Sequence, residues 1–209
     1  MISNTGMYMM KIFMLFPVAL AQVEFERKFT DKESHAIKLL VDQTRPNIHN
    51  QVTKNTAVLD LPEFMEIKSY IHLQCENYLN NVYQPEEKVT IEITQSWINC
   101  TLPGQKHHLH RHPNSFLSGC LYLDVDSSDV IRFFHDRYDA IKLSPAVFNE
   151  FNSDSWTVPV SNGTLLIWPS RLQHDVPPTT STRDRVSLSF NTWIRGTIGS
   201  ETKLGQVKL

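Results

Sequence analysis

Four of the nine histidines of this 209-residue chain lie within six residues, in the segment GQKHHLHRHPNSFLSGCLY from Gly104 to Tyr122. His108, His110 and His112 are spaced by two, so on an extended strand their side chains leave the same face, whereas His107 points to the other. Neighbours on one face lie about 6.5 Å apart, close enough to bind one metal ion, but the first and third lie about 13 Å apart. At most one His-x-His pair can therefore share a metal.

A histidine cluster alone does not define a metal site, because histidine is also a common hydrogen-bonded or surface residue. His174 is the candidate third ligand, and it follows a strand-like stretch and a turn at Pro169-Ser170. Two ligands from one strand and a single ligand from a distant loop form an open site, with positions left for substrate or oxygen.

A polar row follows on the last predicted strand, where Arg185, Ser187, Ser189 and Asn191 alternate with mostly apolar residues. Such a row faces either water or a polar cavity, since antiparallel sheets often keep one face solvated. If it lines a cavity, the guanidinium of Arg185 and the hydroxyl of Ser187 point the same way. This pair is suited to binding a carboxylate through charge-assisted hydrogen bonds.

Composition indicates one soluble domain with a single substantial core, because 41% of the residues are apolar. The net charge of −2 gives no general basic field for nucleic acid or membranes. Three widely spaced cysteines without a CxxC motif favour a reducing compartment, hence the cytoplasm. Residues 11–22 imitate a secretory signal, but Pro17 interrupts the apolar run, and a buried first strand is the better interpretation.

Periodicity predicts an α+β chain: helices first, then many short strands. Thr30 to Glu33 form a capping box that opens a helix, and Pro62 begins a second helix that ends before Pro85. Strands are predicted at residues 12–25, 89–100, 115–125, 130–134, 164–168 and 185–194, with 46–56 as a loop and 135–162 irregular. We expect one integrated domain made of an N-terminal strand and helices (1–88), an antiparallel sandwich or barrel (89–194) and a loosely ordered tail (195–209).

Three segments together resemble a known family: SWINCTLPGQKHHLHRHPNSFLSGCLYL, GTLLIWPSRLQHDVPP and RDRVSLSFNTW. In this order they are similar to the Fe(II)- and 2-oxoglutarate-dependent oxygenases, and most of all to small oxygenases of marine bacteriophages and bacteria. The similarity covers about residues 94 to 194 and is weaker in the N-terminal third.

The resemblance implies a double-stranded β-helix, or jelly roll, with N-terminal supporting helices. It also implies one Fe(II) held by His110, His112 and His174, and 2-oxoglutarate held by Arg185 and Ser187, with Tyr122 and Asn99 lining its pocket. The family chemistry uses O2 to decarboxylate 2-oxoglutarate to succinate and CO2 while a substrate is oxidised, usually by hydroxylation, and ascorbate can support it. His107 and His108 are expected to flank this site.

His112 departs from the wider superfamily, in which most members have Asp or Glu at this position. Either His112 is a metal ligand, as its parity with His110 favours, or a water or a nearby carboxylate completes the site. Three neutral imidazoles would leave the metal centre one unit more positive.

A metal-binding cupin with other or no catalytic activity is the alternative, because Gly104 precedes His110 and His112, and Gly163 precedes Pro169 and His174. The match lacks the Glu expected after the paired histidines. The motifs are compatible with a protein side chain, a nucleobase or a small metabolite as substrate. The sequence is also compatible with a homodimer. Residues 44–57 and 135–160 are the segments expected to select the substrate.

Overall fold

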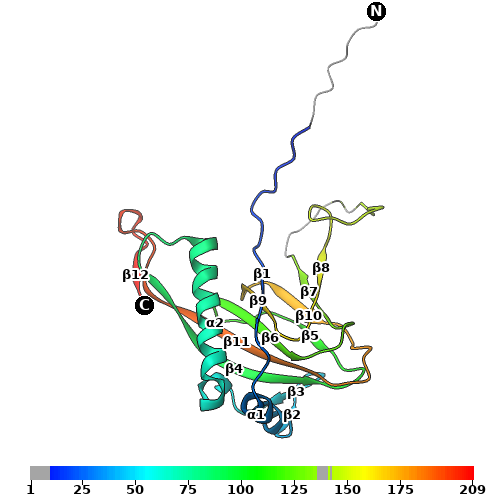
Figure 1. Ribbon diagram of the computed structural model, residues 1–209. Helices are drawn as coiled ribbons and strands as arrows, with labels where there is room; N and C mark the ends of the chain where they lie inside the picture. The colour runs from blue at the N-terminus through cyan, green and yellow to red at the C-terminus, as the bar shows by residue number, and fades with distance from the viewer. Residues whose placement is uncertain (1–9, 136–140, 142) are drawn as a thin grey trace, which may run out of the picture.

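Two antiparallel sheets form the jelly roll that the sequence predicted, in a computed structural model that describes residues 10–135, 141 and 143–209 (Figure 1). The eight-stranded sheet has the order β1-β9-β6-β11-β4-β3-β2, with β12 paired to β11. The four-stranded sheet has the order β5-β10-β7-β8. The large sheet contains β1 (Ala21–Glu24), β2 (Thr44–Pro46), β3 (Gln51–Thr53), β4 (Val89–Thr101), β6 (Leu117–Asp124), β9 (Thr164–Pro169), β11 (Arg185–Ile198) and β12 (Val207–Lys208); the small one contains β5 (His107–His110), β7 (Val130–Phe134), β8 (Ser155–Pro159) and β10 (Gln173–Val176).

Two helices precede the sheets, as expected. The first, α1 (Asp31–Val41), begins with the predicted capping box, in which Thr30 and Glu33 exchange hydrogen bonds. Glu33 is buried and also pairs with Arg27, which lowers the pKa of its carboxyl group. The second, α2 (Met65–Tyr78), follows short 3-10 turns η1 (Val58–Asp60) and η2 (Pro62–Phe64) and ends in a π-helical turn η3 (Leu79–Tyr83).

The two faces of the large sheet bury different cores, because strand side chains alternate. In β9, Leu165 and Ile167 pack with the helices, whereas Leu166 and Trp168 pack toward the small sheet. The helices and the small sheet therefore cover opposite faces of the large sheet, and the space between the sheets is free to hold a site (Figure 1).

Several sequence predictions were wrong at the N-terminus and in loops. The strand predicted at 12–25 is limited to β1, and residues 10–17 are exposed and extend away from the sheets (Figure 1). The loop 46–56 contains β3, which pairs with β2, and β8 lies inside the region expected to be irregular. Both corrections concern strands too short to show a periodic pattern.

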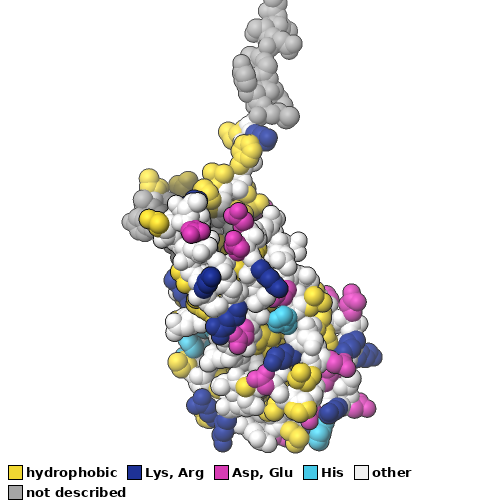
Figure 2. All heavy atoms as spheres, turned by 90° about the vertical axis from the view of Figure 1, so that its left-hand side faces the viewer, with side chains coloured by type: hydrophobic (Ala, Val, Ile, Leu, Met, Phe, Trp, Pro, Cys, Tyr) yellow, Lys and Arg dark blue, Asp and Glu magenta, His cyan; other side chains and the backbone are white. Residues whose placement is uncertain are grey.

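The C-terminal tail is also more ordered than predicted. The last core strand, β11, continues to Ile198, and a 3-10 turn η4 (Glu201–Lys203) leads into β12, which pairs back onto β11. None of the helices in the described ranges is both long and apolar enough to cross a membrane. Figure 2 shows acidic and basic side chains interspersed on the face it presents, so that face has no large patch of one sign.

Candidate metal and carboxylate site

The polar row of β11 faces the interior between the sheets. Arg185, Ser187 and Ser189 line one pocket, and all three are buried or half-buried. Their neighbours Val186, Leu188 and Phe190 point to the helix-covered core. The interpretation of this row as a solvent-facing surface is therefore wrong.

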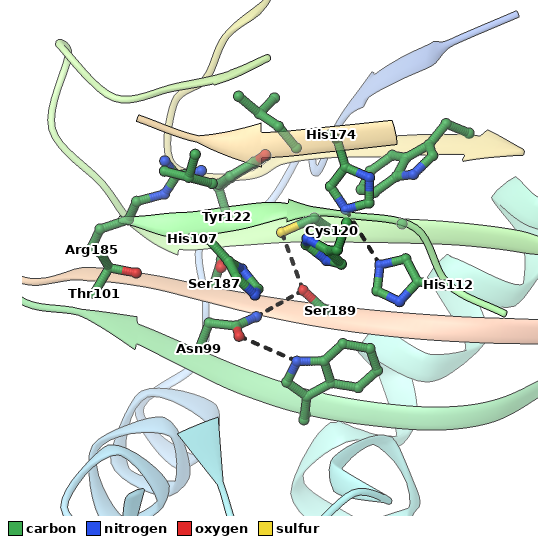
Figure 3. A pocket seen from close by; sticks show the side chains of 16 residues that line it. Asn99, Thr101, His107, His112, Cys120, Tyr122, His174, Arg185, Ser187 and Ser189 are labelled. Carbon is green, nitrogen blue, oxygen red and sulfur yellow. Dashed lines mark hydrogen bonds between the residues drawn. The ribbon is translucent and has the colours of Figure 1, made fainter. Parts of the chain in front are cut away.

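The neighbouring strands β4 and β6 place further polar side chains on the same face of the large sheet as Ser187. Ser187 lies opposite Asn99 on β4 and opposite Tyr122 on β6, and both of these residues line the pocket. Asn99 Nδ2 donates to Ser189 Oγ at 2.9 Å, and its Oδ1 accepts from Trp97 Nε1 at 3.3 Å. Asn99 thus links neighbouring side chains and keeps one N–H and one lone pair for a ligand (Figure 3).

The small sheet supplies the histidines. His110 on β5 lies directly opposite His174 on β10, so His174 comes from a strand and not from the predicted loop. His110 Nδ1 lies 2.7 Å from the carbonyl oxygen of His108, and His174 Nδ1 lies 3.1 Å from that of Leu172. A carbonyl can only accept, so both Nδ1 atoms carry the proton and each Nε2 keeps a free lone pair.

His112 lies just beyond the end of β5 and completes a group of three. Its Nε2 is 3.3 Å from Nε2 of His174, and one nitrogen from each of His110, His112 and His174 lies within 4.8 Å of the others. No carboxylate of the described residues belongs to this group. Asp175, next to His174 in the sequence, is held by Arg132 at 2.6 and 2.8 Å. Completion of the site by a nearby carboxylate is therefore not supported.

Burial keeps these imidazoles neutral. Loss of solvent lowers the pKa of His112 to about 4 and that of His107 to about 3, with a smaller contribution from neighbouring histidines. The pKa of His110 is also lowered by burial, and that of His174 falls well below its usual value for the same reason. Neutral imidazoles with free Nε2 atoms are the form that binds metals.

A buried hydrogen-bond network holds His112 in place and explains several motif residues. Ser118 Oγ lies 2.8 Å from both Ser170 Oγ and Asn191 Oδ1, and Ser170 Oγ donates to Ser115 Oγ at 2.7 Å. The amide of His112 donates to the carbonyl oxygen of Ser170 at 3.1 Å. Serines of the first two sequence segments and Asn191 of the third thus form one network, which reaches His112 through the backbone of Ser170.

His107 does not point away from the site, contrary to the sequence prediction. His110 pairs with His174, but His107 pairs with Val176, so three steps on β5 match two on β10. This bulge reverses the parity, and the ring of His107 stacks on that of His110 with centroids 4.5 Å apart. Nitrogens of His107, His108 and His110 also lie within 4.8 Å of one another.

The other end of the pocket is suited to an anion. Arg185 is 3% exposed, donates from Nη1 to the carbonyl oxygen of Val130 at 2.8 Å, and lies over the ring of Tyr122 at 5.2 Å. The hydroxyl of Tyr122 is buried and makes no hydrogen bond of good geometry. Burial raises the pKa of Tyr122 well above its usual value, so the hydroxyl remains a donor.

Figure 3 shows Arg185 at one end of this pocket, His112 and His174 at the other, and His107 between them. Sequence reasoning identified Arg185, Ser187, Tyr122 and Asn99 as neighbours but omitted Trp97, although it stands two residues before Asn99 on the same strand face. Cys120, which the sequence did not single out for the site, also lines the pocket.

Residues 95–191 match the family described as "Putative 2OG-Fe(II) oxygenase". No curated protein matches the chain in sequence. The family match covers all three motif segments and favours the oxygenase interpretation over the cupin.

Solved structures share the fold at low sequence identity. A prolyl-4-hydroxylase from Pseudomonas putida is 15% identical, with a TM-score of 0.52, over 85% of this chain and 92% of that one. HygX from Streptomyces hygroscopicus, solved with nickel, 2-oxoglutarate and hygromycin B bound, is 12% identical, with a TM-score of 0.56, over 84% and 82%. The epimerase SnoN from nogalamycin biosynthesis is 12% identical, with a TM-score of 0.58, over 84% and 76%. Residues 95–191 therefore resemble the 2OG-Fe(II) oxygenase family, and the chain shares the fold of these solved structures.

Proposed function

We propose that this protein is an Fe(II)- and 2-oxoglutarate-dependent dioxygenase that hydroxylates its substrate. The observation that carries the proposal is the presence of two complementary ends in one buried pocket. Three neutral imidazoles converge at one end, and a buried guanidinium beside an unsatisfied hydroxyl lies at the other. A 2-oxo dicarboxylate fits this pocket, because its 2-oxo acid group can bind a metal at the histidine end while its other carboxylate meets the guanidinium.

His110, His112 and His174 would hold the iron. The Nδ1 hydrogen bonds of His110 and His174 fix their tautomers, and the amide of His112 is anchored to Ser170. Imidazole ligands suit iron among other transition metals, and three of them leave positions open for a cosubstrate and oxygen. The donor set therefore fits the ion implied by the family.

Arg185, Tyr122 and Ser187 would bind the distal carboxylate of 2-oxoglutarate. Arg185 has donors beyond the one used by Val130, and the Tyr122 hydroxyl makes no hydrogen bond of good geometry. A carboxylate at this end would satisfy both, which gains more free energy than a surface contact because each donor is already desolvated. Asn99 would line the pocket of this ligand, next to Ser189 and Trp97, to which it is hydrogen-bonded.

The bound iron would supply the oxidising chemistry: O2 and 2-oxoglutarate yield succinate, CO2 and one oxygen atom that enters a substrate C–H bond. The chain's residues orient the cosubstrate and exclude water from the space between the sheets. Ascorbate would support activity by keeping the iron reduced. All three cysteines are free and buried, which agrees with the proposed cytoplasmic, reducing location.

The test uses purified protein with Fe(II), ascorbate and 2-oxoglutarate under air. We expect slow succinate formation without added substrate, and its loss when iron is omitted. Binding of 2-oxoglutarate to the zinc-loaded protein, followed by calorimetry, provides a second readout that does not depend on turnover. Metal-loaded protein that neither binds 2-oxoglutarate nor forms succinate would contradict the proposal.

A further inference from the structure

A second hollow, with a volume of about 230 Å³, opens on the other side of the histidines. It is bounded by His110 and His112, by Trp97 on β4, and by the β2–β3 hairpin, which contributes Arg45 and Asn47. This hollow is distinct from the Arg185 end, because Arg185, Ser187 and Tyr122 do not line it. It is the place from which a second molecule can approach the nitrogens that face the proposed metal position.

Arg45 gives this hollow an unbalanced positive charge. It is the one arginine, lysine or acidic side chain among the lining residues, and it makes no ion pair or side-chain hydrogen bond within the described part of the chain. The other ionisable residues that line the hollow are His107, His110 and His112, and none of them can supply a negative charge. Arg45 is exposed to solvent, and its unpaired guanidinium favours an anion beside it in the hollow.

His112, which stands where most of the superfamily has a carboxylate, also makes the hollow more positive. A divalent metal with three neutral imidazoles and the proximal carboxylate of 2-oxoglutarate has a formal charge of +1, whereas a carboxylate ligand at position 112 would make it zero. The proposed metal centre and Arg45 therefore both present positive charge to the hollow. No acidic side chain of the described residues lines it to offset this charge.

Trp97 and the volume of the hollow restrict the shape and the size of the ligand's carbon skeleton. Trp97 is half-buried, and its Nε1 is already bonded to Asn99, so its ring offers a flat apolar surface. A volume of about 230 Å³ is below the roughly 300–1,000 Å³ of pockets for drug-sized ligands. The ligand that fits is compact and has a flat or apolar carbon skeleton.

We propose that the substrate is a small molecule with a carboxylate or phosphate group, which Arg45 binds while Trp97 packs against its carbon skeleton next to His110 and His112. This inference rests on the proposed function, since it treats the hollow as the substrate site of the oxygenase. It narrows the earlier alternatives, because a neutral nucleobase or an uncharged protein side chain would leave Arg45 without a partner.

The test compares three probes of similar shape: benzoate, phenyl phosphate and neutral benzamide. Each is titrated into full-length protein loaded with zinc and 2-oxoglutarate, and binding is followed through the Trp97 indole resonance, assigned with Trp97→Phe. We expect at least one acid to bind about tenfold more tightly than benzamide. The acid that binds better identifies the head group.

The Arg45→Gln variant should lose this tenfold preference, and Arg45→Lys should retain part of it. Arg195→Gln is the matched control, because Arg195 pairs with Glu92 far from the hollow. If the loaded protein binds 2-oxoglutarate but does not distinguish the acids from benzamide, or if Arg45→Gln changes nothing, the inference is overturned and the proposed function stands. If 2-oxoglutarate itself does not bind, the proposed function fails first.

Discussion

His110 and His174 face each other across the β5–β10 pair, and each donates its Nδ1 hydrogen to the carbonyl oxygen two residues earlier in the chain. The two rings are therefore fixed in the same tautomer by the same local geometry. Because backbone carbonyls supply both acceptors, the Nε2 atoms converge without any charged partner bonded to the Nδ1 atoms. Both imidazoles are therefore neutral and oriented for metal binding even without a bound ion.

Removing one of these rings should abolish metal binding. His110→Ala and His174→Ala each delete an Nε2 from the group of three, and we expect both variants to lose iron-dependent turnover and at least about 100-fold in metal affinity. Affinity is measured by competition with a chromophoric chelator. His35→Ala removes an exposed histidine of α1 and is the control. His108→Ala should be tolerated better, and full metal binding by His174→Ala would contradict the assignment.

The metal-free protein should lose stability as the pH falls below about 6.5. His112 and His107 have native pKa values of about 4 and 3, so they stay neutral while the unfolded chain takes up their protons. The unfolded state then binds more protons, and the free energy of unfolding decreases by at most about 1.4 kcal/mol per pH unit for each histidine.

Urea denaturation at pH 7.5, 6 and 5 measures this slope. The His107→Asn variant should have a shallower slope than the wild-type protein. An unfolding free energy independent of pH across this interval would show that the histidines titrate normally in the folded state.

Gly119→Ala should destabilise the barrel by about 1–3 kcal/mol. A Cβ at this position would lie 2.2 Å from the Phe190 ring and 2.7 Å from the carbonyl oxygen of Leu166, so the strands must shift. Gly205→Ala is the control, because the nearest atom to its added Cβ lies 3.9 Å away. Thermal unfolding measures both variants. Adding Phe190→Leu should restore part of the loss, and equal melting temperatures for the two glycine variants would contradict this packing argument.

The sequence predicted those parts of the site that obey regular strand alternation. Arg185 and Ser187 share a face of β11, as their parity required. The failure at His107 has a physical cause: a one-residue bulge in β5 reverses parity, and nothing in a run of histidines indicates where a strand bulges.

The other failures concern pairing over long range. Arg45 borders the histidines because the three-residue strands β2 and β3 add to the edge of β4, and strands this short carry no periodic signal. The prediction of a buried strand at residues 12–25 was wrong for a different reason, since residues 10–17 are exposed. An apolar run specifies what could be buried, but burial requires a partner surface that sequence composition does not reveal.

Arg185→Ala should raise the 2-oxoglutarate requirement by about 10–100-fold, since a desolvated charge-assisted contact contributes roughly 1.5–3 kcal/mol. Arg183→Ala is the matched control, because Arg183 is exposed and pairs with Asp124. The ratio of kcat to KM for 2-oxoglutarate, with iron saturating, separates the two. An unchanged KM in Arg185→Ala would remove Arg185 from the carboxylate site.

Tyr122→Phe should affect stability and cosubstrate binding in opposite directions. The hydroxyl is fully buried without a hydrogen bond of good geometry, and such a group costs about 1–3 kcal/mol in the folded state. Its removal should therefore leave the ligand-free protein as stable or raise its unfolding free energy by about 1 kcal/mol. The same change should weaken 2-oxoglutarate binding about tenfold, because the variant cannot donate to the carboxylate beside Arg185.

Calorimetric titration of 2-oxoglutarate and urea denaturation of the ligand-free protein measure the two effects. Ser187→Ala is a useful comparison, since it removes a hydroxyl from the same pocket wall. A purely structural role for Tyr122 predicts lower stability and unchanged affinity. A role in holding the carboxylate predicts unchanged or higher stability and weaker binding of 2-oxoglutarate. The unsatisfied hydroxyl destabilises the ligand-free protein, and the bound cosubstrate removes this penalty because its carboxylate accepts the hydrogen bond.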